Sequence, residues 1–218
     1  MQALETIKGK WRNLPRWAKW LIIGGAVLAV VGGAALGMKV GTIYWQGDPR
    51  WGKRFLGNSS TTIGRAGCLL TTLVMASNTL LGDDLTPDAG NVLVTDAGGF
   101  SGANLILEKA AAAFGLRAPD KDRIRKGSVV QMRAKIDDAL RRGGFAIVHV
   151  DKDDNDVTKT GDHFVLIHSK SANGVYAAAD SAPGKDTMID AATLTGTAMW
   201  DKTPKHYTIV GVAPVFKA

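Results

Sequence analysis

The run Phe145-Ala146-Ile147-Val148-His149-Val150 decides the fold class, because the pattern of apolar residues changes there from helical spacing to strand-like runs. Its β-branched and aromatic side chains, bounded by the Gly143-Gly144 pair, predict a buried strand. Further strands are expected at residues 163–169, 174–180 and 206–212. Upstream of this run, apolar residues recur at helical spacing instead. Helices first and strands second predict an α+β fold, with N-terminal helices packed on a C-terminal antiparallel β-sheet.

Four helices are expected before the first strand. They lie at residues 68–80, from Thr86-Pro87-Asp88 onward, at residues 101–114, and from a Ser128 cap to the Gly143-Gly144 stop. Residues 41–65 are rich in Gly, Trp and turn residues and are expected to be irregular.

Cys68 is the only cysteine in the chain, and it follows the loop Ile63-Gly64-Arg65-Ala66-Gly67. An apolar run with helical spacing comes next, so the thiol is expected at the start of a helix. There the unpaired backbone N–H groups and the helix dipole favour the thiolate, which is the nucleophilic form. The alternative is a small buried apolar residue, as most single cysteines are. A single cysteine also excludes an intrachain disulfide.

His163 and Asp180 are the residues expected to act with Cys68. Nucleophilic catalysis by a thiol needs a nearby base, a group that orients the base, and donors for the oxyanion. His163 opens a strand directly after a polar loop, and Asp180 closes the next strand, 17 residues on. Adjacent antiparallel strands can place these two side chains beside each other.

The other three histidines are weaker candidates for the base. His149 lies within an apolar strand and is expected in the core. His168 comes five positions after His163, which predicts the opposite face of the strand. His206 stands near a strand start, with no acid placed to orient it.

Segments around Cys68 carry a resemblance to a known family. Residues 44–52 (YWQGDPRWG), 63–64 (IG) and 67–75 (GCLLTTLVM) resemble the papain-like cysteine peptidases related to the bacteriocin-leader-processing family. Further landmarks follow in order: Thr86-Pro87, Phe114-Gly115-Leu116, Ile147-Val148-His149-Val150, residues 161–167 and Ala179-Asp180-Ser181. The resemblance covers about residues 43–212 and implies a papain-like fold, peptidase activity and no cofactor.

The resemblance also implies roles for individual residues. Cys68 is then the nucleophile, His163 the general base and later acid, and Asp180 the acid that orients the imidazole. Gln46 matches the glutamine that donates to the oxyanion together with the backbone N–H of Cys68. It lies 22 residues before Cys68, so the intervening loop must bring it back; the alternative is a surface glutamine near a turn. Ser181 stands where a proline often follows the acid.

The N-terminal part holds an uncharged apolar run of 18 residues at positions 21–38. That length suffices for a membrane-spanning helix, and Trp17 and Trp20 before the run suit the membrane interface. Five cations precede the run and Lys39 follows it, which predicts a cytoplasmic N-terminus. Nine of the 18 residues are Gly or Ala, a composition that favours association between helices and resembles the signal-arrest-release segments of some phage endolysins.

This pattern predicts three parts: a basic cytoplasmic segment at residues 1–19, a transmembrane signal anchor at 20–39, and a papain-like peptidase domain at 40–218. The chain is then expected to cross the inner membrane once and contact lipid through residues 20–39, with its catalytic domain outside the cytoplasm or associated with a virion. The alternatives are a cleaved signal peptide and a buried helix of a soluble protein.

Charge and spacing argue against two other classes of protein. Residues 1–39 carry six basic residues and one acid, and the other 21 basic and 19 acidic residues leave only +2 of the net +7. No basic face or motif indicates nucleic-acid binding. Acidic and amide residues in 151–162 follow part of a calcium-loop spacing, but Asp156 occupies the position that needs Gly. A solvated hairpin loop is the favoured interpretation, and no metal or cofactor is expected.

The sequence therefore predicts a membrane-anchored thiol peptidase that acts outside the cytoplasm. Its expected substrates are peptidoglycan stem peptides or secreted peptides, and a phage lysis or entry enzyme is one form of it. The alternative is a catalytically silent papain-like binding module, or a structural membrane protein of a virion or secretion apparatus.

Overall fold

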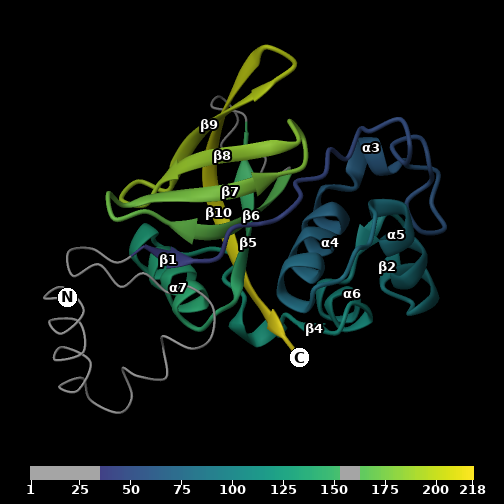
Figure 1. The fold of residues 1–218 in the computed structure, drawn as a ribbon, viewed down its shortest axis with the longest axis horizontal. Helices are drawn as coiled ribbons and strands as arrows, with labels where there is room; N and C mark the ends of the chain where they lie inside the picture. Colours follow the sequence, from purple (N-terminus) through teal and green to yellow (C-terminus); the bar gives the residue numbers. More distant parts are fainter. Residues whose placement is uncertain (1–34, 153–162) are drawn as a thin grey trace, which may run out of the picture. The chain divides into compact units, whose positions relative to one another are not determined.

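A closed antiparallel β-barrel forms the C-terminal half of the protein (Figure 1). The structure is a computed structural model and describes residues 35–152 and 163–218, within the compact unit Ala35–Ala218. The barrel strands are β5 (Phe145–Asp151), β6 (His163–Lys170), β7 (Val175–Asp180), β8 (Lys185–Asp190), β9 (Thr195–Trp200) and β10 (Thr203–Lys217). They pair in the order β6-β5-β10-β9-β8-β7, and the pairing of β7 with β6 closes the circle.

This closure shows that the predicted fold class is wrong. The prediction was a papain-like α+β fold with N-terminal helices packed on a C-terminal antiparallel β-sheet, preceded by a transmembrane helix. The two strands that the sequence did not predict, β8 and β9, complete the circle between β7 and β10. In β8 only Thr187 and Ile189 are buried, so its apolar alternation is weak. The β9–β10 hairpin turns through Asp201 and Lys202, both at positive φ (43° and 70°), without the Asn-Gly or Asp-Gly pair that usually marks such a turn.

Helices lie on two sides of the barrel (Figure 1). Helix α4 (Cys68–Leu81) contacts β6, and α5 (Pro87–Asp96) and α6 (Leu107–Ala113) follow beside it. Helix α7 (Val129–Arg141) contacts β5 and β10. The shorter elements are β1 (Leu36–Gly37), α3 (Ile63–Ala66), β2 (Phe100–Ser101), β3 (Asn104–Leu105), β4 (Leu116–Arg117) and η1 (Asp120–Asp122).

Three of the four expected helices are confirmed. Helix α4 begins at Cys68, α5 begins at Pro87, and α7 begins after Ser128 with a capping box to Gln131. The helix expected at residues 101–114 begins only at Leu107, because the preceding residues form the β2–β3 hairpin.

The expected transmembrane anchor at residues 20–39 is contradicted at the end that the structure describes. Residues 1–34 lie outside the described residues, and with them the expected basic segment at 1–19. Leu36–Gly37 form strand β1, antiparallel to β6, rather than the last turn of a helix. Within 35–152 and 163–218, no helix combines the length and apolar character needed to cross a bilayer. The structure therefore contradicts the predicted anchor. With it, the predicted single-pass topology and inner-membrane localisation are wrong.

Barrel closure can be tested at Gly196, which lies opposite Ile189 where β9 meets β8. A Cβ at Gly196 would collide with the backbone carbonyl oxygen of Met188, so alanine must push the two strands apart. We expect Gly196→Ala to lower the free energy of unfolding by about 1–3 kcal/mol in urea denaturation. Gly41→Ala is the matched control, because no heavy atom lies within 4 Å of its added Cβ. Equal stability of the two variants would contradict the closed barrel.

Candidate active site

Cys68 is the first residue of α4, as the sequence predicts. The preceding Gly67 is required sterically, because a Cβ there would lie 2.5 Å from the carbonyl oxygen of Ile63 and 2.7 Å from its Cγ2. This close passage lets the chain turn directly from α3 into α4. The Cys68 side chain is 9% exposed and lines a cleft. The thiol therefore combines a helix N-terminus with access from outside.

His163 and Asp180 lie side by side on neighbouring strands. With Leu166 opposite Ala179, Asp180 falls opposite Val165, and His163 is the diagonal neighbour on the same face. The Nε2 atom of His163 lies 2.7 Å from Oδ1 of Asp180. The imidazole and the Cys68 side chain also interact by hydrogen bonding and charge, which shifts the pKa of both groups. Because Nε2 faces Asp180, Nδ1 is the ring nitrogen available to the thiol. The structure thus brings the three predicted residues together in one chain of contacts.

Four donors hold the carboxylate of Asp180, which is fully buried. Besides the 2.7 Å contact with His163, it accepts bonds from the backbone N–H of Ala182 (3.0 Å), Thr187 Oγ1 (3.1 Å) and Tyr207 Oη (2.7 Å). Strands β7 and β10 are three places apart in the circle of six, so the bond from Tyr207 crosses the interior of the barrel. A buried carboxylate without such donors would be strongly unfavourable. Closure of the barrel therefore supplies a hydrogen-bond donor to the buried Asp180 carboxylate, which contacts His163.

The pKa values of Cys68 and His163 shift toward a thiolate–imidazolium pair. Burial raises the pKa of the Cys68 thiol, but the hydrogen bond and charge of His163, with backbone bonds from Phe164 and Leu69, bring that pKa below its ordinary value. Burial lowers the pKa of His163, whereas its bonds to Asp180 and Cys68 and their charges raise it to about 9. Each group thus favours the charged form of the other, which is the form needed for attack on a carbonyl.

Gln46 is held beside the thiol by a second set of contacts. Its Nε2 donates to the carbonyl oxygen of Gly64 (3.0 Å), and its Oε1 accepts from the hydroxyl of Ser181 (2.9 Å). The backbone N–H of Gln46 also donates to the carbonyl oxygen of Ser181 (2.9 Å). Gln46 is 8% exposed, so the alternative of a surface glutamine is wrong. A carboxamide nitrogen carries two hydrogens, and the one not bonded to Gly64 remains for a ligand in the cleft.

The cleft has a volume of about 440 Å³ and lies between the helical part and the barrel. Gln46, Cys68 and His163 all line it. Trp200 packs edge-on against the His163 ring, with 5.1 Å between ring centroids, and its indole N–H donates to Tyr207 Oη at 2.7 Å. One aromatic side chain thus covers the base and supports the donor that holds Asp180.

The other three histidines do not line this cleft within the described residues. His149 stacks on Phe164 with 4.3 Å between ring centroids and is half-buried rather than in the core. His168 is buried, with Nε2 2.9 Å from Asp186 Oδ1 and Nδ1 3.0 Å from the carbonyl oxygen of Met38. His206 is exposed, and its Nδ1 lies 3.2 Å from Thr197 Oγ1.

Sequence reasoning missed the residues that support Asp180. Thr187 and Trp200 lie on the two strands that were not expected, and Tyr207 was known only as part of a strand. The available signal for β9 was the presence of Thr195, Thr197 and Trp200, which favour strands, but no turn motif accompanied it.

No metal site emerges from the described part of the chain, where no group of three or more His, Cys, Asp or Glu side chains could hold an ion. The partial calcium spacing falls largely on residues 153–162, which lie outside the described residues. A scan against known protein families and a search of curated proteins find no match to this chain. The function proposed below therefore rests on the geometry of the site and on the motifs of the sequence.

The thiolate–imidazolium pair predicts an unusual pH dependence of Cys68 alkylation by iodoacetamide. An ordinary thiol reacts faster as pH rises through about 8.5, because its thiolate forms there. The lowered pKa of Cys68 places this rise at a lower pH than in an ordinary thiol. His163→Gln should return the midpoint to that of a free thiol or higher, since it removes the imidazolium. A wild-type midpoint at or above about 8.5 would contradict the pair.

Tyr207→Phe tests the bond that crosses the barrel. The variant leaves one acceptor position of a fully buried carboxylate unsatisfied, so the free energy of unfolding should fall by about 1–3 kcal/mol. The control is Tyr44→Phe, because the Tyr44 hydroxyl is half-buried and accepts a long 3.4 Å bond from Asn78. Urea denaturation measures both variants. Equal stabilities would show that the Tyr207 bond contributes nothing.

Proposed function

We propose that this protein is a cysteine peptidase that cleaves peptide bonds through an acyl-enzyme on Cys68. One observation carries the proposal: the thiol, His163 and Asp180 form a continuous chain of contacts in one cleft, with the Gln46 amide beside them. Such a chain has the geometry of an activated nucleophile with an oriented base. The motif resemblance to papain-like peptidases supplies the substrate class, which is peptides, including peptidoglycan stem peptides.

In the first half of the reaction, the Cys68 thiolate attacks the carbonyl carbon of the scissile bond. The electron pair of the carbonyl moves to its oxygen, and the free N–H of the Gln46 amide and the backbone N–H of Cys68 stabilise the resulting oxyanion. The carbonyl re-forms as the C–N bond breaks, and the His163 imidazolium gives its proton to the leaving amine. The products are a free amine and a thioester on Cys68.

In the second half, neutral His163 accepts a proton from a water molecule that attacks the thioester carbonyl. A second oxyanion forms in the same place and collapses by breaking the C–S bond. The acid product leaves, and the thiolate and imidazolium are restored. Asp180 keeps Nδ1 of His163 directed at the sulfur in both halves, because it holds Nε2.

Two variants and one control variant test this proposal. Cys68→Ala and His163→Gln should each reduce kcat/KM by about 10³-fold or more, since they remove the nucleophile and the proton carrier. His206→Gln is the matched histidine control and should keep wild-type activity, because His206 lies on an exposed stretch of β10 outside the cleft. Activity is measured by mass spectrometry of digests of a peptide library and of purified peptidoglycan.

If neither substrate yields a Cys68-dependent product, the peptidase proposal is contradicted. That result would leave a binding module that has kept the residues of a thiol site without turnover.

A further inference from the structure

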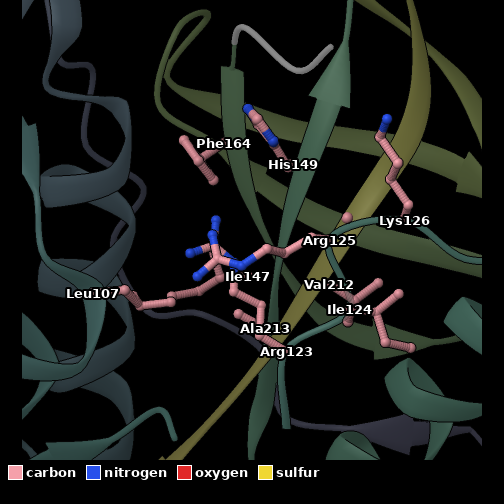
Figure 2. A pocket seen from close by; sticks show the side chains of 11 residues that line it. Leu107, Arg123, Ile124, Arg125, Lys126, Ile147, His149, Phe164, Val212 and Ala213 are labelled. Carbon is pink, nitrogen blue, oxygen red and sulfur yellow. The ribbon is translucent and has the colours of Figure 1, made fainter. Parts of the chain in front are cut away.

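Arg123 lies where the catalytic cleft meets a second cavity. This cavity has a volume of about 330 Å³ and is shown in Figure 2. Arg123 and Phe164 line both the cavity and the cleft that contains Cys68. A substrate bound at Cys68 therefore passes these two side chains before any part of it enters the cavity.

The backbone fixes this position of Arg123. The neighbouring Ile124 exchanges two hydrogen bonds with Val212 of β10, each 2.8 Å long between nitrogen and oxygen. The segment 123–126 is thereby joined to the barrel wall, and Figure 2 shows Arg123 and Arg125 reaching from it into the cavity. The segment that carries Arg123 belongs to no helix or strand, and this bridge to β10 holds it in place.

The cavity is positively charged. Arg123, Arg125 and Lys126 line it, and its described lining contains no carboxylate. Arg125 is paired with Asp120 at 2.7 Å, whereas none of the ion pairs among the described residues involves Arg123. Burial and the neighbouring charge of Arg125 lower the pKa of Arg123, with Asp120 opposing them. A half-buried guanidinium without a carboxylate is a binding group for an anion.

The rest of the lining limits what that anion can be. The stacked pair His149 and Phe164, with Leu107 and Ile147, gives the cavity an apolar wall. A cavity of about 330 Å³ holds a single side chain or a chain terminus rather than a polymer of phosphates. Beyond residue 39 the chain carries 21 basic and 19 acidic residues, so it offers no broad basic face for a nucleic acid.

We propose that this cavity is an anion-binding subsite of the peptidase, and that Arg123 selects substrates with a carboxylate close to the scissile bond. The inference rests on the proposed function and deepens it, because it names the substrate class as acidic peptides. An extended peptide advances about 3.3 Å per residue, so the carboxylate belongs within the first few residues on one side of the scissile bond. Its source is either an acidic side chain or a free C-terminus.

The test uses the Cys68→Ala protein, which binds peptides without cleaving them. The probes are fluorescein-labelled, C-terminally amidated hexapeptides in which one Glu is scanned through the positions, each with a Gln twin. In one further pair, one peptide has a free C-terminal carboxylate and its twin has an amidated C-terminus. We expect fluorescence anisotropy to show binding at least about 10-fold tighter for the acidic member of one pair, because a guanidinium–carboxylate bond is lost in its twin. The position of that pair distinguishes a side chain from a C-terminus.

Variants of Arg123 decide whether this preference comes from the cavity. Arg123→Gln should abolish it, Arg123→Lys should retain part of it, and Arg117→Gln should leave it intact. Arg117 is the matched control, because it stacks on Phe216 and does not line the cavity. Thermal unfolding of each variant shows whether it is folded. Equal binding of every pair, no binding at millimolar peptide, or a preference unchanged in folded Arg123→Gln would each overturn the subsite.

The same peptide pairs incubated with wild-type protein test the proposed function separately. Acid-dependent binding without cleavage would retain the subsite and overturn the peptidase. Cys68-dependent cleavage without acid preference would retain the peptidase and overturn the subsite.

Discussion

The buried carboxylate of Asp180 connects closure of the barrel to the candidate active site. It is fully buried and accepts four hydrogen bonds, and three of the donors are side chains on β6, β8 and β10. These strands lie around the circle, so the donors converge only if the sheet closes on itself. An open sheet would leave Tyr207 far from β7 and the carboxylate short of a donor. The hydrogen bonds to Asp180 would be lost if the barrel opened, and the same carboxylate fixes the orientation of His163.

The proposed chemistry is placed where the barrel meets the helical part. The barrel supplies the base at the first residue of β6, and α4 supplies the thiol at its first residue. Both are nearly buried, with His163 at 2% and Cys68 at 9% exposure, so their mutual attraction is weakly screened. Gln46 joins the same site through Ser181, which directly follows Asp180. A single turn after β7 thus positions both the acid and the oxyanion donor.

Local signals in the sequence predicted the positions of the candidate site residues, and non-local pairing explains what those signals could not predict. A glycine before an apolar helix placed Cys68, and the ends of two strong strands placed His163 and Asp180. Closure of the barrel depends on β8 and β9, whose apolar alternation is weak and whose hairpin turn uses Asp201 and Lys202. Without those strands, neither Thr187 nor Trp200 could be assigned a role, and the fold class was wrong. The anchor prediction relied on length and low polarity, yet half of that run is Gly or Ala, and its end pairs with β6 as strand β1.

The protonation state of the His163 ring shows whether Cys68 and His163 form a thiolate–imidazolium pair. Nitrogen-15 NMR, with the His163 signals assigned by their loss in His163→Gln, reports whether both ring nitrogens carry a proton. The account predicts an imidazolium at neutral pH that loses its proton near pH 9, and a lower midpoint in Cys68→Ala, where the thiolate is absent. A neutral His163 ring at pH 7, or the same midpoint of His163 deprotonation in wild type and in Cys68→Ala, would contradict the pair.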